Sequence, residues 1–151
     1  MSAGKAFYLL SATLFGGILL AANPGTSQDA APDVIGSWAL AFSDPSGVRS
    51  SSEINLQADG KYDFQFVSEG GACDYVVSFT GHFAVLDDEI EFSPNSGKRG
   101  CVGDEVALQG QGLISERASR GNGRNSFRLS GDQLCLRLIG SEYPESCYTR
   151  R

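Results

Sequence analysis

Short runs in which apolar and polar residues alternate fill this chain after residue 33, and they constrain its fold more than any other feature. In residues 61–66, KYDFQF, aromatic rings alternate with charged and amide side chains. Successive side chains of a β-strand point to opposite faces, so such a run predicts a strand with one apolar face. Polar turn sequences, such as ADG at residues 58–60 and LDDE at residues 86–89, separate the runs. The pattern predicts an all-β, antiparallel protein.

Runs of this kind follow one another from the tryptophan at position 38 to the C-terminus. They span residues 38–42, 53–57, 61–66, 74–85, 90–92, 105–109, 126–129, 133–138 and 146–150. Each is short and has one apolar face, as the strands of small barrels do. We expect an antiparallel up-and-down β-barrel of about eight to ten strands. Gly81 shares the parity of apolar residues within the longest run, and we expect that strand to bend or bulge there.

The first 33 residues differ in composition from the rest. Lys5 precedes a largely apolar run over residues 6–22, and a segment rich in Pro, Gly, Ser and Ala follows at residues 23–33. This order is typical of a secretory signal peptide. We therefore expect a signal peptide over residues 1–22, a flexible leader over residues 23–33 and the barrel domain over residues 34–151.

The expected location is outside the cytoplasm, either periplasmic or secreted. Because the apolar run is just long enough to span a bilayer, an uncleaved membrane anchor formed by residues 6–22 is the alternative. The net charge of −6 at pH 7 repels nucleic acids and anionic membrane surfaces. Nucleic acid is therefore not expected as a partner, and a membrane only through an uncleaved N-terminal segment.

All four cysteines lie in the expected barrel domain. An even number in an exported chain indicates two disulfides, whereas the wide spacings and the single histidine argue against a metal site. Three pairings are open. If each disulfide joins the two strands of one hairpin, Cys73 pairs with Cys101 and Cys135 pairs with Cys147, because each pair is symmetric about a turn sequence. We expect this pairing.

Gly36-Ser37-Trp38 opens the first expected strand and resembles the G-x-W signature that opens the first barrel strand of lipocalins and related calycins. Two later runs, LQADGKYDFQF at residues 56–66 and FTGHFAVLDDEIEFS at residues 79–93, are similar to runs of bacterial lipocalin-like domains. The second lipocalin signature, T-D-Y, has no counterpart in this chain. The resemblance implies a lipocalin-like barrel.

In calycins an arginine from the last strand covers the tryptophan and closes one end of the barrel. The resemblance assigns these roles to Trp38 and Arg150, because Arg150 shares the inward parity of Tyr148 in the expected last hairpin. A cation is attracted to an indole face. In a simple meander the two residues meet only if the number of strands is even, so we expect a further short strand within residues 110–120.

The inward aromatic rings indicate what such a barrel binds. They are Tyr62, Phe64, Phe66, Tyr75, Phe79, Phe83 and Phe92. If the barrel separates them, they line a cavity for a small apolar or amphipathic molecule, and we expect an exported lipocalin-like binding protein. If they pack on one another, the alternative is an interaction module with a filled barrel and functional loops, such as a protease inhibitor or an accessory subunit of an envelope complex.

No residue pattern indicates an enzyme, a cofactor or a bound metal. The single histidine, His82, is expected to face away from the core, and no serine lies in a G-x-S-x-G context. An arginine-rich segment places Arg117, Arg120 and Arg124 close together in sequence. Guanidinium groups bind carboxylates and phosphates, so these residues are candidate contacts for an anionic headgroup.

Overall fold

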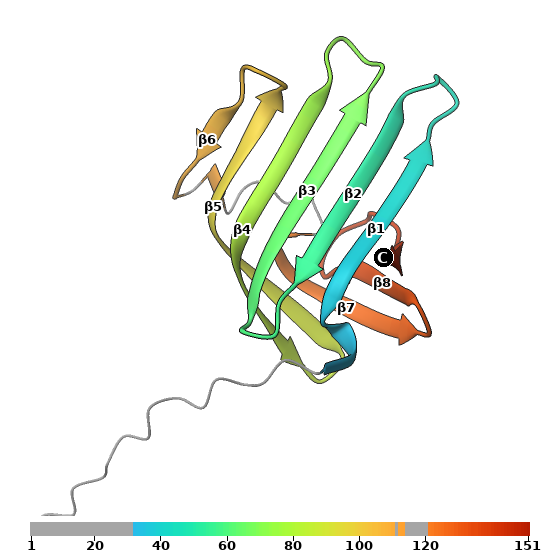
Figure 1. Ribbon diagram of the computed structural model, residues 1–151, viewed down its shortest axis with the longest axis vertical. Coiled ribbons are helices and arrows are strands. Elements are labelled where there is room, and N and C mark those ends of the chain that lie inside the picture. Colours follow the sequence, from blue (N-terminus) through green and yellow to red (C-terminus); the bar gives the residue numbers. More distant parts are fainter. Residues whose placement is uncertain (1–31, 111, 114–120) are drawn as a thin grey trace, which may run out of the picture.

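The computed structural model describes residues 32–110, 112–113 and 121–151 (Figure 1). A short 3-10 turn, η1 (Pro32–Val34), precedes the strands of this part of the chain. These are β1 (Gly36–Ser43), β2 (Arg49–Leu56), β3 (Lys61–Glu69), β4 (Tyr75–Leu86), β5 (Glu89–Cys101), β6 (Val106–Leu108), β7 (Gly123–Ser130), β8 (Gln133–Leu138) and β9 (Ser146–Arg150). Every neighbouring pair is antiparallel, and the all-β prediction is confirmed.

The expected signal peptide and nearly all of the expected leader lie outside the described residues. Within the described part of the chain, no helix is long and apolar enough to cross a membrane.

Eight of the strands close into a barrel. β1 to β5 form one meander, β5 pairs with β7, and β7 to β9 form a second meander that returns to β1. β6 pairs with β5 and lies outside this ring. The ring has an even number of strands because one of the nine predicted runs is not part of it. The further strand expected within residues 110–120 is not needed for closure, and residues 111 and 114–120 lie outside the described residues.

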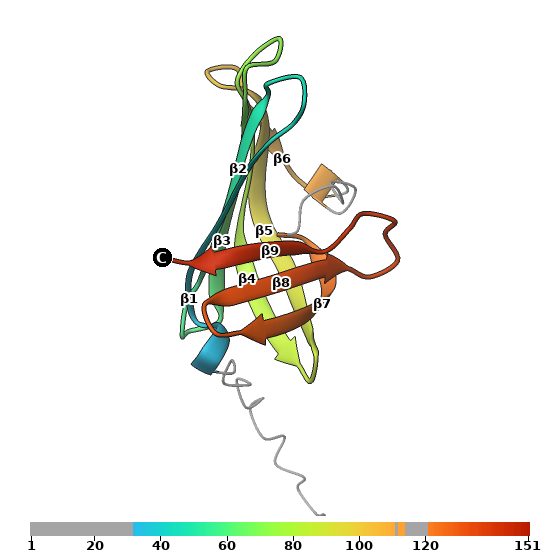
Figure 2. The same ribbon diagram turned by 90° about the vertical axis from the view of Figure 1, so that its right-hand side faces the viewer.

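The two meanders differ in extent, which leaves the barrel open at one end. β5 pairs with β7 only through residues 89–92, and its later residues 97–99 pair with β6. β1 pairs with β9 only at Trp38 and Ala39. The far ends of β1–β6 therefore project beyond β7–β9, as the two perpendicular views show (Figures 1 and 2).

A bulge bends the longest hairpin where the sequence predicted it. The register between β4 and β5 shifts between Thr80 and Gly81. A Cβ atom at Gly81 would overlap the carbonyl oxygen of Ser93. The strand β5 can pass so close only to a glycine, and this position lets the hairpin turn around the barrel.

Inward side chains from both meanders form a single hydrophobic core at the closed end. Trp38, Ile90, Leu134 and Leu136 have no exposed surface there. Each side chain of this size contributes about 1.5–3 kcal/mol when it is fully buried. Since these residues come from β1, β5 and β8, their burial holds the two meanders together.

Both expected disulfides are present. Cys135 and Cys147 are direct cross-strand partners in β8 and β9, with their Cα atoms 3.9 Å apart. Cys73, shortly before β4, is bonded to Cys101 at the end of β5, with their Cα atoms 5.7 Å apart. Structural disulfides persist in oxidising compartments, so this pair of bonds indicates an exported protein.

Candidate functional site

Trp38 and Arg150 close one end of the barrel. The indole ring is fully buried, and its Nε1–H donates to the Val34 carbonyl oxygen at 2.9 Å. The guanidinium carbon of Arg150 lies 4.2 Å from the ring centroid. The same guanidinium donates to the carbonyl oxygens of Ile35 at 2.8 Å and Asp33 at 2.6 Å. Arg150 therefore lies over the indole ring and is bonded to the backbone that precedes β1.

Gly36 makes this arrangement possible. Its φ of +139° is favourable only for glycine, and a Cβ atom there would lie 2.9 Å from the Nη1 atom of Arg150. The glycine of the G-x-W sequence therefore leaves room for the arginine that covers the tryptophan.

The aromatic rings of the closed end are packed on one another. The ring centroids of Tyr62 and Phe92 are 4.9 Å apart, and those of Phe64 and Phe79 are 6.0 Å apart. These four rings, and also Phe83, are buried. Such spacings are those of rings in direct contact. Phe66 and Tyr75, the remaining two of the predicted ligand-binding rings, lie nearer the open end and are partly buried against the core.

The buried tyrosine hydroxyls are bonded within the protein. The hydroxyl of Tyr62 donates to the Gly121 carbonyl oxygen at 2.7 Å, and burial raises the pKa of this phenol. The hydroxyls of Tyr148 and Ser52 lie 3.1 Å apart in a second buried hydrogen bond. A Cβ atom on Gly121 would overlap the ring of Phe64, so the Gly121 backbone lies in direct contact with that ring. At this end of the barrel the rings thus contact one another, and the hydroxyls of Tyr62 and Tyr148 bond within the protein.

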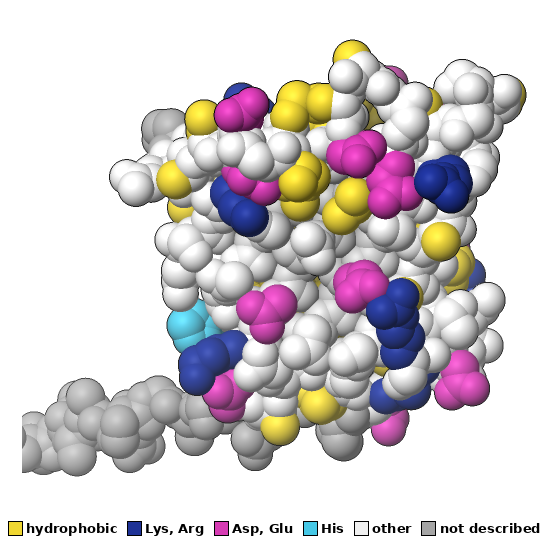
Figure 3. All heavy atoms as spheres, turned by 45° about the horizontal axis from the view of Figure 1, so that its top comes forward, with side chains coloured by type: hydrophobic (Ala, Val, Ile, Leu, Met, Phe, Trp, Pro, Cys, Tyr) yellow, Lys and Arg dark blue, Asp and Glu magenta, His cyan; other side chains and the backbone are white. Residues whose placement is uncertain are grey.

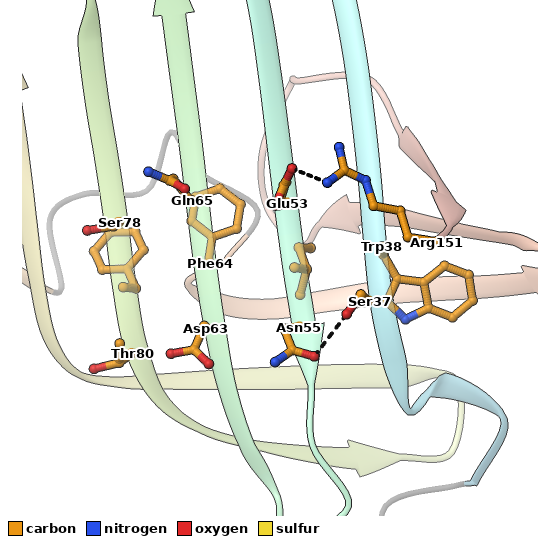
Figure 4. A pocket seen from close by; sticks show the side chains of 12 residues that line it. Ser37, Trp38, Glu53, Asn55, Asp63, Phe64, Gln65, Ser78, Thr80 and Arg151 are labelled. Atoms are coloured by element: carbon orange, nitrogen blue, oxygen red, sulfur yellow. Dashed lines mark hydrogen bonds and ion pairs between the residues drawn. The ribbon is translucent and has the colours of Figure 1, made fainter.

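A groove of about 560 Å³ lies on the opposite, outer face of β1–β4 (Figure 4). Its lining side chains alternate with the core residues along each strand and so point away from the barrel. They are Ser37 of β1, Glu53 and Asn55 of β2, Asp63 and Gln65 of β3, Ser78 and Thr80 of β4, and the C-terminal Arg151. The inward residues Trp38, Ile54, Phe64 and Phe79 lie beneath them. The volume is within the range of small-molecule sites.

The groove carries hydrogen-bonding groups of both kinds and has paired charges. Arg151 and Glu53 form an ion pair at 2.6 Å. The amide of Gln57 donates to Asp63 at 3.0 Å. Figure 3, which is tilted toward the open end, shows acidic and basic side chains spread over this face with uncharged groups between them. Polar groups cover this surface. Because positive and negative charges are interspersed on it, its electrostatic potential has no single dominant sign.

A second, smaller hollow of about 290 Å³ lies farther along β1 and β2, toward the open end. Its lining includes Ala41, Ser43, Arg49, Ser51 and Glu69, all on the outward parity. Arg49 and Glu69 form an ion pair across it at 3.3 Å. Both hollows thus lie on the outer face of this part of the sheet.

Of the three arginines predicted to contact an anion, Arg124 alone lies within the described residues. Arg124 at the start of β7 is exposed and forms an ion pair with Glu89 of β5. Arg117 and Arg120 lie outside the described residues. The anion contact therefore stays a prediction.

Two other polar positions behave as structural features. His82 is exposed and faces away from the core, as predicted, and its Nδ1 atom lies 3.1 Å from the side-chain amide of Asn95. The ligand-type atoms of Cys135, Glu145 and Cys147 lie within 4.8 Å of one another. Both sulfurs belong to the same disulfide, so they are not available as thiolate ligands for a metal.

Sequence reasoning did not find the outer groove. The outward positions of residues 53–55, 63–65 and 78–80 were not among the predicted site residues. The available signal was that these positions carry carboxylate, amide and hydroxyl groups on three consecutive strands with no lysine or arginine among them.

No protein-family model matches this chain, and no curated protein matches it. The closed eight-stranded antiparallel barrel is compatible with a lipocalin-like fold.

Proposed function

We propose that this protein is an exported, non-catalytic binding module with a filled barrel, and that it binds its partner on the outer face of β1–β4. The observation that carries this proposal is the position of the concave surface. Two hollows lie outside the barrel, on the outer face of the sheet, whereas the rings at the closed end are in contact with one another. The two disulfides support export.

The chemistry of the groove favours a polar, hydrogen-bonding partner. Asn55 and Gln65 each offer a donor and an acceptor, and the hydroxyls of Ser78 and Thr80 offer both as well. Glu53 is already neutralised by Arg151. A partner surface rich in amide, hydroxyl or backbone groups fits this lining, and an envelope protein is the partner class that agrees with export.

Site-specific photo-crosslinking tests this proposal. A photo-crosslinking residue placed at Gln65, in the centre of the groove, is expected to give a discrete adduct in the envelope of the native host. The matched control carries the same residue at Arg137, which is exposed on the outer side of β8. Adducts from Gln65 alone support the proposal. Equal adducts from both positions, or none from Gln65, contradict it.

The carrier function is the second candidate, and it is favoured by Phe66 and Tyr75. These inward rings are only partly buried, so the open end presents apolar surface to an amphipathic molecule. Native mass spectrometry of the protein purified from its host, together with titration of a fluorescent fatty acid, tests this function. A co-purified lipid-like mass, or saturable binding that Phe66→Trp abolishes, would favour the carrier over the interaction module.

A further inference from the structure

The disulfide Cys135–Cys147 lies in a row of cross-strand partners on the outer face of β7–β9. Arg128 of β7 is the direct partner of Cys135 in β8, and Cys135 is the direct partner of Cys147 in β9. Figure 2 shows these three strands side by side. Their neighbours Leu134 and Tyr148 belong to the core. Because successive residues of a strand point to opposite faces, the row faces away from the core.

This disulfide has a cation at one sulfur and a carboxylate at the other. The Nη2 group of Arg128 donates to Sγ of Cys135 at 3.5 Å and to Oε2 of Glu145 at 2.9 Å. The same carboxylate oxygen lies 3.7 Å from Sγ of Cys147. A guanidinium stabilises negative charge on a nearby sulfur, and a carboxylate opposes it. When the bond breaks, the charge is therefore more stable on Cys135 than on Cys147.

The two cysteines also differ in their access to solvent. Cys135 is 1% exposed, whereas Cys147 is partly exposed. β9 pairs with β1 only through Thr149 and Arg150. Within the described part of the chain, no strand pairs with Cys147 on the side away from β8. An external thiolate therefore reaches Cys147, and its attack there makes Cys135 the leaving group.

We propose that Cys135–Cys147 is a redox-active disulfide that undergoes thiol–disulfide exchange with an external dithiol. One thiolate of the dithiol forms a bond to Sγ of Cys147, the Cys135–Cys147 bond breaks, and its electron pair stays on Cys135 beside Arg128. The second thiolate of the dithiol then displaces Cys147, which takes up a proton. Two electrons have passed to the protein, the dithiol has become a disulfide, and its other proton has gone to solvent.

Arg128 is the positioning residue in this exchange. A sulfur whose anion is stabilised leaves faster, so the guanidinium speeds the first step. It also stabilises the reduced form, which makes the disulfide a better oxidant. Glu145 holds the guanidinium at this place through its ion pair with Arg128.

The packing of β8 and β9 makes the exchange reversible. Leu134 and Tyr148 are cross-strand partners on the core side of the bond, and they are 0% and 1% exposed. Their burial keeps the two strands in register while the bond is open. The sulfurs of Cys135 and Cys147 then stay opposite each other, and the bond re-forms without refolding. This activity goes beyond the outer-face binding proposed above and does not depend on it.

Reduction of the folded protein by dithiothreitol, followed by differential alkylation and mass spectrometry, tests the proposal. We expect Cys135 and Cys147 to become reduced at a rate that does not depend on urea well below the unfolding transition. Such a rate shows that the bond is attacked in the native state. A bond that resists dithiothreitol until the protein unfolds overturns the proposal.

Arg128→Gln should slow the reduction of Cys135–Cys147 by at least about threefold. It should also lower the reduced fraction at equilibrium in a glutathione buffer. The bond Cys73–Cys101 is the internal reference in each sample, and its rate should not change. Loss of a merely structural contact would loosen the hairpin and speed reduction, so the direction of the change separates the two roles.

The matched control is Arg137→Gln, which removes an exposed arginine of β8 with the same change in net charge. We expect this variant to be reduced at the wild-type rate, and Arg128→Lys, which keeps a cation, to be reduced faster than Arg128→Gln. Unchanged or faster reduction in Arg128→Gln overturns the proposal. Equal slowing by Arg137→Gln also overturns it, because the effect would then come from the overall charge and not from the contact with Cys135.

Discussion

The guanidinium carbon of Arg150 lies 4.2 Å from the centroid of the Trp38 ring, and the two residues are direct cross-strand partners in β9 and β1. This contact joins the first and last strands of the ring. The ladder between these strands contains only two residue pairs. Much of the contact that holds β9 to β1 therefore comes from the stacked side chains and from the hydrogen bonds of Arg150 to the backbone before β1.

Trp38→Ala is expected to lower the free energy of unfolding by about 3–5 kcal/mol, the cost of deleting a buried aromatic side chain. Urea unfolding followed by circular dichroism measures this change. A loss below about 1 kcal/mol would show that the ring does not anchor the core.

Arg150→Ala should cost less, about 0.5–2 kcal/mol for the cation over the ring, and should shift the fluorescence of the single tryptophan. The control is Arg151→Ala, which removes the neighbouring arginine and its exposed ion pair with Glu53. We expect the control to leave both the fluorescence and the stability nearly unchanged. Equal effects of the two substitutions would contradict the stacking role of Arg150.

Gly36→Ala should disturb the tryptophan environment, whereas Gly47→Ala should not. Both glycines have a positive φ, so both substitutions introduce backbone strain. Only at Gly36 does the added Cβ approach Arg150, since nothing lies within 4 Å of the corresponding position at Gly47. Tryptophan fluorescence separates the two effects, and an unchanged spectrum in Gly36→Ala would contradict the close approach.

The two disulfides should differ in their contribution to stability. Cys73–Cys101 closes a separation of 28 residues and Cys135–Cys147 one of 12 residues. Loop-closure entropy then makes removal of the first bond, by paired Cys→Ala substitutions, more costly by roughly 0.8 kcal/mol. Urea unfolding of the two double variants measures the difference. The opposite order would show that native contacts outweigh chain entropy here.

Tyr62→Phe should lower the free energy of unfolding by about 1 kcal/mol near neutral pH, because the Gly121 carbonyl oxygen loses its donor. Burial raises the pKa of Tyr62 above its ordinary value of 10.0 in the folded state. The unfolded chain therefore loses this proton first as the pH rises, and wild-type stability falls above pH 10. The variant lacks this part of the decline. Identical slopes in both proteins above pH 10 would contradict the shift.

Local patterning accounts for the features that could be predicted from the sequence. The period of two in runs such as residues 61–66 defines each strand and the face that it buries. The cysteine positions lie symmetrically about turn sequences, so each disulfide follows from the hairpin that contains it. The bend at Gly81 could likewise be predicted from the strand pattern, whereas the pairing of Trp38 with an arginine was implied by the calycin resemblance, and strand parity then selected Arg150.

The position of β6 could not be predicted, since its sequence has the same alternation as a strand of the ring. Its place is decided by β5, which pairs with β7 through residues 89–92 and then leaves the ring to pair with β6. The sequence also could not predict whether the rings of Tyr62 and Phe92 touch. The distance between facing strands depends on how the whole sheet closes.

The sequence by itself determined the strands, their buried faces and the partners of the cysteines, since all of these depend on residues close together in one strand or one hairpin. Only the tertiary structure decided where the barrel ends, which face is concave and which edge stays open. Those properties depend on the relative lengths and twist of strands distant in the chain. Because β9 pairs with β1 only as far as Ala39, Phe42 stays exposed. The sequence around Phe42 does not indicate where that pairing ends.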